Sequence, residues 1–375
     1  MKDEVKYMKL KIEQGTRMKN YYLTALAGLY LLIGSLPVEA APVVTSCIVV
    51  KETVGKNDFI LKVEANDPTD ANLKYKFAVV LGEATLTPNG NMATITGTKP
   101  GAYQFEVTVT NSKGESKKDT AFFHSFDPKA TVMYFDKDLW AAALKKERSR
   151  PTDPAYTWPG RDTTLPDVLI IGDSISYGYT SYVRDALKGK ANVYRLPRIS
   201  WTTFHGRSNT HLWLGGHEWD VICFNYGLHD MKRYSGKRLG RKPEATLFRG
   251  VSLADYKIAL KQNIDMMKSY GAELVWTNTT FVPEGSRGRV AGDDTLYNKA
   301  ALEVLADYPE IAVNDLYTSS KAHPKEQRNR DPHFLPAGDE RNGLHTAMII
   351  EGVLKKGDRQ KAQAEAAAAE KLRKE

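Results

Sequence analysis

A serine stands where an apolar run meets the start of a predicted helix. Ser174 follows the run at 168–171 in the segment Gly172-Asp173-Ser174. Free N–H groups and the dipole at a helix N-terminus favour negative charge. This position therefore suits a nucleophile whose attack creates an oxyanion. Taken alone, such a segment is more often a capping turn in which Asp173 or Ser174 is the N-cap, so the serine needs partners to count as a nucleophile.

A histidine near the C-terminus is the candidate base for this serine. A serine hydroxyl is a weak nucleophile without a neighbouring base. Among eight histidines, His333 lies two residues after Asp331, just before the last predicted helix. His333 would take the Ser174 proton, and Asp331 would fix its tautomer. A surface histidine beside a turn-forming Asp-Pro is the alternative interpretation. His345 competes for the role, but we expect it to lie within the helix, packed or solvated.

A third polar segment follows the apolar run that begins at position 221. It contains Asn225 and His229, and either side chain could donate a hydrogen bond to an oxyanion. The alternative is a polar loop in which Asp230 caps a neighbouring element. We expect this segment to lie beside Ser174, because the carboxyl ends of parallel strands meet at one edge of a sheet.

The elements that would position these residues alternate along the second half of the chain. Short apolar runs alternate with helical periodicity, which predicts a parallel sheet with crossover helices and three layers, as in flavodoxin-like folds. The predicted strands are 168–171, 193–196, 221–225, 273–277 and 311–316, and the predicted helices are 179–187, 253–270, 294–305 and 337–354.

The first half has a different pattern. Residues 42–125 alternate apolar and polar positions between turn residues, which predicts an antiparallel β-sandwich. Residues 126–165 are predicted to be a linker with a short helix at 138–146 and a Pro-rich irregular part. The part with alternating strands and helices would span 166–355, and 356–375 would form a charged helical tail.

The N-terminal extension, 1–41, contains a secretory signal pattern that starts near Met18. A basic residue precedes an apolar stretch at 22–36 and a small-residue end at Val38-Glu39-Ala40. We expect the protein to be secreted or periplasmic, with membrane contact only through this segment if it stays uncleaved. A membrane anchor is disfavoured, because a bilayer span needs about 20 apolar residues. Lipid attachment at Cys47 is disfavoured by its distance from the apolar stretch.

Charge and cysteine content narrow the possible partners. The net charge of +8 is largely diffuse, without the basic stripe interleaved with aromatics that nucleic-acid binding favours. We therefore expect no nucleic-acid partner. The two cysteines, Cys47 and Cys223, lie in different predicted units and are not expected to pair. No clustered histidines, cysteines and carboxylates indicate a metal site, and we expect no metal or other cofactor.

Together, the three polar segments resemble those of the SGNH/GDSL hydrolase superfamily over about 166–355. Gly172-Asp173-Ser174 resembles the first family block, with its serine nucleophile, and Asp331 and His333 resemble the last block. The similarity is greatest to a bacterial secreted esterase subgroup with the motifs N-x-G-L-H-D and D-x-H-F. Residues 101–114 resemble the last strand pair of PKD and cadherin-like immunoglobulin domains, which implies a spacer or a weak glycan-binding module before the hydrolase.

Two departures from the family pattern concern the oxyanion hole. The usual side-chain donor is an asparagine, and His229 stands at that position, so the donor is either His229 or Asn225. The second family block normally supplies a glycine N–H, but this stretch reads Arg198-Ile-Ser-Trp-Thr-Thr. The Trp201 N–H could replace it, beside the N–H of Ser174.

The resemblance implies a serine esterase that acts through a Ser-His-Asp acyl-enzyme mechanism. With export and the sandwich, it implies an acylated carbohydrate as substrate, and O-acetyl groups are favoured. A lipase or thioesterase for longer acyl chains is an alternative, as is a non-catalytic surface protein that binds a glycan or a partner through a degenerate hydrolase domain. The sequence does not indicate an oligomeric state.

Overall fold

The computed structural model describes residues 41–147, 153–235, 238–239 and 248–374. The predicted signal segment therefore lies outside the described residues, except for position 41. Among the described residues, no helix is long and apolar enough to cross a membrane. Cys47 and Cys223 are both buried and unpaired, as expected.

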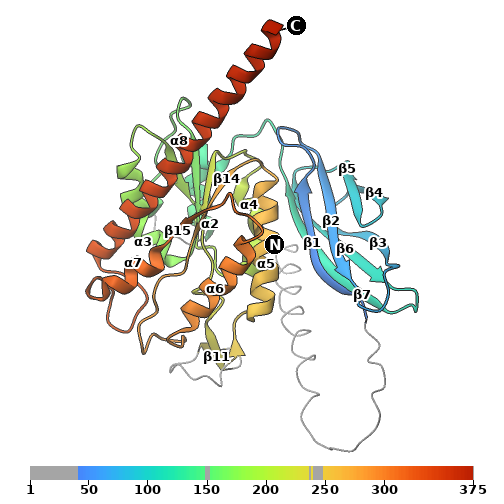
Figure 1. Ribbon diagram of the computed structural model, residues 1–375, viewed down its shortest axis with the longest axis horizontal. Helices are drawn as coiled ribbons and strands as arrows, with labels where there is room; N and C mark the ends of the chain where they lie inside the picture. The colour runs from blue at the N-terminus through green and yellow to red at the C-terminus, as the bar shows by residue number, and fades with distance from the viewer. Residues whose placement is uncertain (1–40, 148–152, 236–237, 240–247, 375) are drawn as a thin grey trace, which may run out of the picture. The chain divides into compact units, whose positions relative to one another are not determined.

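The first part contains two antiparallel sheets, with strand orders β1-β2-β5-β4 and β3-β6-β7 (Figure 1). Alternation along β6 puts Tyr103, Phe105, Val107 and Val109 in the interior, as a half-buried strand requires. The antiparallel sheets were predicted, whereas the immunoglobulin-like assignment stays a prediction. The strands are β1 Val43–Lys51, β2 Phe59–Asn66, β3 Lys74–Leu81, β4 Thr85–Asn89, β5 Met92–Thr96, β6 Gly101–Thr110 and β7 Ser116–Ser125.

The second part is built on a five-stranded parallel sheet in the order β15-β14-β10-β8-β9. Every residue of β8 and β10 is buried, as expected for a sheet covered on both faces. The mixed α/β class with a parallel sheet was predicted. The strands are β8 Asp167–Ile171, β9 Asn192–Arg195, β10 Val221–Phe224, β14 Glu273–Thr277 and β15 Ala312–Asn314.

Helices cover both faces of this sheet (Figure 1). Helices α3 and α8 pack together, while α4, α5 and α6 form a second contacting group. The helices are α2 Lys137–Glu147, α3 Ser174–Ala186, α4 Thr203–Leu214, α5 Leu253–Lys268, α6 Asp293–Leu305, α7 Leu316–Ala322 and α8 Pro336–Lys374. The described residues also form the short 3-10 helices η2 Met133–Phe135, η3 Pro154–Tyr156 and η4 Pro324–Glu326. A small sheet contains β11 Arg233–Ser235, β12 Arg238–Leu239 and β13 Phe248–Arg249.

Several predicted boundaries need correction. Helix α3 begins at Ser174 and not at 179, because Asp173 caps it. Helix α8 does not end at 354 but continues to Lys374. Helix α4 was not predicted, because its buried side includes the polar Thr210 and His211, which interrupt the apolar periodicity. Helix α7 was not predicted either; the chain turns into it at Leu316, where the strand prediction still continued.

The order of the strands creates a switch point between β8 and β10. After β8 the chain goes to the edge strand β9, and it then returns across the sheet to β10 on the other side of β8. The two strands run level, with Ile171 paired to Phe224 at their carboxyl ends. Ligands of open α/β sheets bind at such a switch point.

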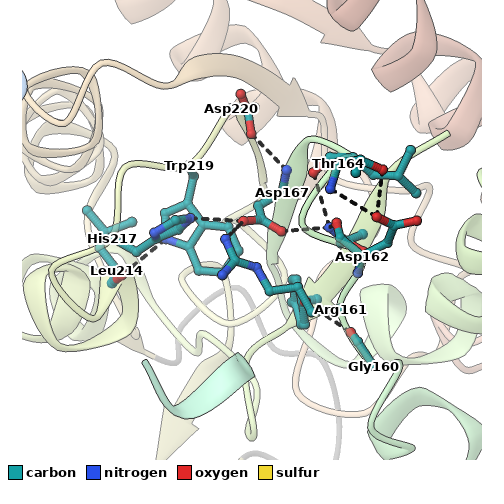
Figure 2. A network of polar contacts seen from close by, with 12 residues as sticks. Gly160, Arg161, Asp162, Thr164, Asp167, Leu214, His217, Trp219 and Asp220 are labelled. Atoms are coloured by element: carbon teal, nitrogen blue, oxygen red, sulfur yellow. Dashed lines mark hydrogen bonds and ion pairs between the residues drawn. The ribbon is translucent and has the colours of Figure 1, made fainter. Parts of the chain in front are cut away.

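The opposite end of β8 is fixed by a charged network. Figure 2 shows the Asp167 carboxylate between Arg161 and His217, and the backbone N–H of Asp167 donates to Asp220. The same carboxylate oxygen lies 2.6 Å from Arg161 Nη2 and 3.2 Å from His217 Nε2. Burial raises the pKa of Asp167, but hydrogen bonds from His217 and Arg161 outweigh this effect and lower it. The ionised carboxylate thereby ties the linker and the α4–β10 connection to the central strand.

A buried histidine joins the first part of the chain to the second. His211 of α4 donates from Nε2 to the Val49 carbonyl oxygen of β1 at 2.8 Å, so its Nδ1 accepts from the Tyr270 hydroxyl at 2.9 Å. Burial lowers the pKa of His211 to about 4. Both ring nitrogens are used in the neutral form, and protonation would turn Nδ1 into a donor, so that the Tyr270 O–H would lose its acceptor.

We predict that His211 makes the protein less stable in mild acid. The unfolded histidine, with a pKa near about 6.5, binds protons more readily than the folded one, so stability falls as the pH decreases from about 6.5 to 4. The expected loss is about 3 kcal/mol, measured as the free energy of unfolding in urea. In His211→Gln this part of the loss should be missing. Parallel pH profiles of the two proteins would contradict the prediction.

Candidate active site

The turn between β8 and α3 exposes Ser174 at the start of the helix. A Cβ atom at Gly172 would lie 2.7 Å from the Ser176 Oγ, so only glycine fits there. The Asp173 carboxylate accepts a hydrogen bond from the Ile175 N–H at 2.8 Å and caps the helix. The capping interpretation is therefore correct for Asp173, and it leaves the neighbouring hydroxyl of Ser174 available for another partner.

The structure brings Ser174, His333 and Asp331 together, although Ser174 and His333 are 159 residues apart along the chain. Ser174 Oγ lies 2.7 Å from His333 Nε2, and His333 Nδ1 lies 2.5 Å from the Asp331 carboxylate. Because the carboxylate can only accept at Nδ1, the neutral ring has its lone pair at Nε2, toward the serine hydroxyl. The arrangement is that of a nucleophile, a base and a carboxylate that orients the base.

Backbone contacts of the preceding loop hold this histidine in place. The Arg328 N–H donates to the His333 carbonyl oxygen at 2.9 Å, and the Gln327 amide donates to that of Pro332 at 3.1 Å. Arg330 adopts a left-handed backbone with φ 56°, which turns the chain toward Asp331. The Asp331 carboxylate also accepts from the His333 N–H at 3.0 Å, so the two residues form one rigid unit.

The carboxylate of Asp331 is ionised and water can reach the pair. Burial raises the pKa of Asp331, but hydrogen bonds from the backbone N–H and the ring of His333 outweigh it and hold the pKa below its usual value. The His333 side chain is 37% exposed. A water molecule can therefore approach the base directly, as a hydrolytic step needs.

Asn225 follows β10 but its amide is used within the sheet. Its Nδ2 donates to the Thr277 carbonyl oxygen at 2.7 Å. The side chain lines a small interior cavity together with Thr277 and Thr280. One of its two amide hydrogens is therefore committed to the neighbouring strand β14, which favours a structural role over a donor to an oxyanion.

His229 lies on the loop after β10 and is almost fully buried. Its Nδ1 is 3.0 Å from Lys232 Nζ, and its ring meets that of Trp201 edge to face at 4.9 Å between centroids. Burial, with the nearby charges of Lys232 and Arg289, holds the pKa of His229 well below its usual value. The imidazole is therefore neutral at pH 7, and the charge of His333 also acts on it, which places it near the base.

Two cations that the sequence did not single out approach this site. Burial and the charge of Arg289 lower the pKa of Lys232 to about 8. Arg289 is buried and donates from Nε to the Leu228 carbonyl oxygen at 3.0 Å. Asp173 is buried too, and burial raises its pKa, although Arg289 and Lys232 act in the opposite direction. Lys232 stands three residues after His229 in the sequence, but this spacing alone does not place its ammonium against the imidazole.

Trp201 adopts a backbone conformation that glycine favours. Its φ is 58°, in the left-handed region that bulky residues rarely occupy. The preceding Ser200 N–H donates to the Gly172 carbonyl oxygen at 2.9 Å, so this segment runs beside the nucleophile turn. The guanidinium of Arg198 lies 5.3 Å above the Trp201 ring. The indole is half-buried between Arg198 and His229.

Asp230 and His345 have structural positions. The Asp230 carboxylate accepts from the N–H and the hydroxyl of Thr203, at 2.9 and 2.7 Å, and so caps the start of α4. Burial raises the pKa of Asp230 to about 7. His345 lies within α8, as expected, and its Nδ1 is 2.7 Å from the Asn314 side-chain oxygen at the end of β15. Its ring is thus packed against the sheet edge.

Comparison with known proteins gives similarities in structure alone. No family model matches the chain, and no curated protein matches it. The chain is similar to a lipase/acylhydrolase from Enterococcus faecalis with 20% identity and a TM-score of 0.42, over 50% of this chain and 96% of that one. It is similar to an acetyl xylan esterase with 15% identity and a TM-score of 0.39, over 48% and 97%. It is also similar to an acetylxylan esterase from Geobacillus stearothermophilus with 14% identity and a TM-score of 0.40, over 50% and 93%.

We predict that position 201 tolerates glycine better than alanine. At φ 58° an alanine Cβ is strained, whereas glycine is not, so Trp201→Gly should be more stable than Trp201→Ala by about 1 kcal/mol. The measurement is the free energy of unfolding in urea. Exposed Arg198, which has no positive φ, is the control, and there alanine should be the more stable variant. The same order at both positions would contradict the left-handed geometry.

Proposed function

We propose that the protein is a serine ester hydrolase with Ser174 as nucleophile, His333 as general base and Asp331 as the carboxylate that orients it. The observation that carries the proposal is the continuous contact from Ser174 Oγ through the His333 ring to Asp331. The resemblance of these segments to SGNH hydrolases agrees with it.

In the acylation step, the Ser174 hydroxyl attacks the ester carbonyl carbon while His333 Nε2 takes its proton. Asp331 accepts the Nδ1–H and stabilises the imidazolium that forms. The tetrahedral intermediate collapses when His333 gives the proton to the departing alcohol oxygen. The ester C–O bond breaks, and the acyl group remains on Ser174.

In the deacylation step, water attacks the acyl-enzyme with His333 again as base. The proton returns to Ser174 Oγ as the second intermediate collapses, and the carboxylic acid leaves. The exposed edge of the His333 ring suits this step, since the attacking water must lie within hydrogen-bond reach of Nε2.

The negative charge of each intermediate would be stabilised by the N–H of Ser174 at the start of α3 and by the Nε2–H of His229. Helix N-terminal N–H groups are preorganised donors that cost no reorganisation. His229 is the better side-chain candidate, because the amide of Asn225 already donates to Thr277. The Trp201 N–H, in the position of the family's glycine, is a third candidate donor.

The substrate we propose is a short acyl ester on a carbohydrate, with O-acetyl groups favoured. Charged and polar groups lie near the nucleophile: Asp173, His229 and Arg289 are buried, and Lys232 is half-buried. Such surroundings favour a small acyl group over a long apolar chain, whose desolvation needs an apolar groove. The contact between Ser174 and His333 also argues against a degenerate domain that only binds a glycan.

Export and the role of the first part belong to the same proposal. The signal pattern near Met18 would send the protein to the periplasm or out of the cell, where acylated polysaccharides occur. The antiparallel sheets over 43–125 would then form an immunoglobulin-like spacer or a weak glycan-binding module. Such a spacer would be held firmly against the hydrolase part by His211.

We predict that Ser174→Ala loses p-nitrophenyl acetate hydrolysis by at least about 10³-fold, because no other nucleophile is held by the base. Ser208→Ala, which changes an exposed serine of α4, is the matched control and should retain activity. Acetate should be released faster than octanoate. Equal activity in wild type and Ser174→Ala would refute the proposed nucleophile, and a preference for octanoate would favour the lipase alternative.

We predict that His229→Ala lowers kcat by about 10²-fold with little change in KM, since an oxyanion donor acts mainly in the transition state. His229→Asn, which restores a neutral N–H donor of shorter reach, should lose less. Steady-state kinetics on p-nitrophenyl acetate measure both. A kcat of His229→Ala equal to that of the wild type would show that another group donates.

A further inference from the structure

One contact beside the nucleophile is not explained by the three catalytic groups. Lys232 Nζ lies 3.0 Å from His229 Nδ1, in a half-buried position where its ammonium also lies 5.7 Å from the centre of the Trp201 ring. Holding a lysine charge away from water costs free energy, so the contact needs a physical reason. The effect of Lys232 on the proton of the His229 imidazole supplies that reason.

An ammonium group has only donors, so it fixes the proton of the histidine. With Lys232 donating, Nδ1 of His229 must accept through its lone pair. A neutral imidazole then has its one proton on Nε2. Burial keeps the ring neutral, and the charges of Lys232, Arg289 and His333 act in the same direction, as does His205 of α4.

We propose that Lys232 is a positioning residue that holds His229 in the tautomer with the proton on Nε2, so that this N–H can stabilise the oxyanion. The inference rests on the proposed esterase function. In the other tautomer the Nε2 lone pair would face the developing negative charge and repel it. Lys232 thus acts through His229 and need not touch the substrate.

The pairing also implies an upper pH limit for activity. Burial and the charge of Arg289 lower the pKa of Lys232 to about 8, with Asp173 acting in the opposite direction. Above this pH the neutral amine has a lone pair of its own and can accept from an Nδ1–H. The tautomer of His229 is then no longer fixed, and kcat falls as the lysine loses its proton.

The decisive experiment is a double-mutant cycle on kcat with p-nitrophenyl acetate. Lys232→Met should lower kcat about 10-fold, less than the loss of the donor itself. In the His229→Ala background the same substitution should have almost no further effect, because the group it acts through is gone. Lys257→Met, which removes a lysine paired with Glu303 on the surface of α5, is the matched control. An equal loss in both backgrounds would overturn the proposal and indicate a direct effect of the charge.

Lys232→Arg supplies the conservative test. Arginine is also a donor without an acceptor, so kcat should be largely kept, and the fall of kcat above about pH 8 should move to higher pH. An unchanged upper limit in this variant would show that Lys232 does not set it.

A second readout does not depend on activity. The ¹⁵N chemical shifts of the His229 ring, assigned by comparison with His229→Asn, should report the Nε2–H tautomer in the wild type and a mixture in Lys232→Met. An unchanged tautomer in Lys232→Met would overturn the proposal even if no ester were hydrolysed. Absence of Ser174-dependent hydrolysis with the expected tautomer change would instead refute the esterase function and leave the His229–Lys232 pairing intact.

Discussion

The turn from β8 into α3 is the constraint on which the site depends. Gly172 has no room for a side chain, Asp173 must cap the helix, and only then does Ser174 start α3 with its hydroxyl outward. The carbonyl oxygen of Gly172 accepts from Ser200, and that of Ile171 accepts from Asn225. One tight turn therefore fixes the segment that contains Ser200 and the segment that begins at Asn225, as well as Ser174 itself. Strand β8 itself is held at its other end by the Asp167 network.

Desolvation determines the charge states around this turn. His229, Lys232 and Arg289 are withdrawn from water to different degrees. Burial lowers the pKa of each side chain and so favours its neutral form. Asp173 is buried as well, which raises its pKa, and the cations partly oppose that shift. The exposed pair of Asp331 and His333 faces water instead, where ionisation of the carboxylate is inexpensive. The imidazole of His229 is thus buried, whereas that of His333 is 37% exposed.

Trp201 combines a left-handed backbone with several side-chain contacts. A tryptophan in the left-handed region is strained, and such strain persists only where the surrounding contacts compensate. Its ring contacts His229 and lies under Arg198 and Lys232, contacts that a glycine could not make. The indole–imidazole contact therefore joins the segment around Trp201 to the loop after β10.

The sequence alone determined which residues could be catalytic and in which kind of fold. Apolar runs between helical segments indicated the parallel sheet, and the residues that follow two of those runs, with Asp331 and His333, indicated the candidate site. These signals are local, because strand burial and motif spacing are properties of short segments. The sequence could not separate Asn225 from His229, because both follow the same strand, and it did not reveal α4, whose buried His211 and Thr210 interrupt the pattern. The tertiary structure adds contacts that the sequence does not show: the Asn225 amide donates to Thr277, and Lys232 reaches His229. Pairing, tautomer and desolvation depend on groups brought together from distant segments, and only the folded chain sets those distances.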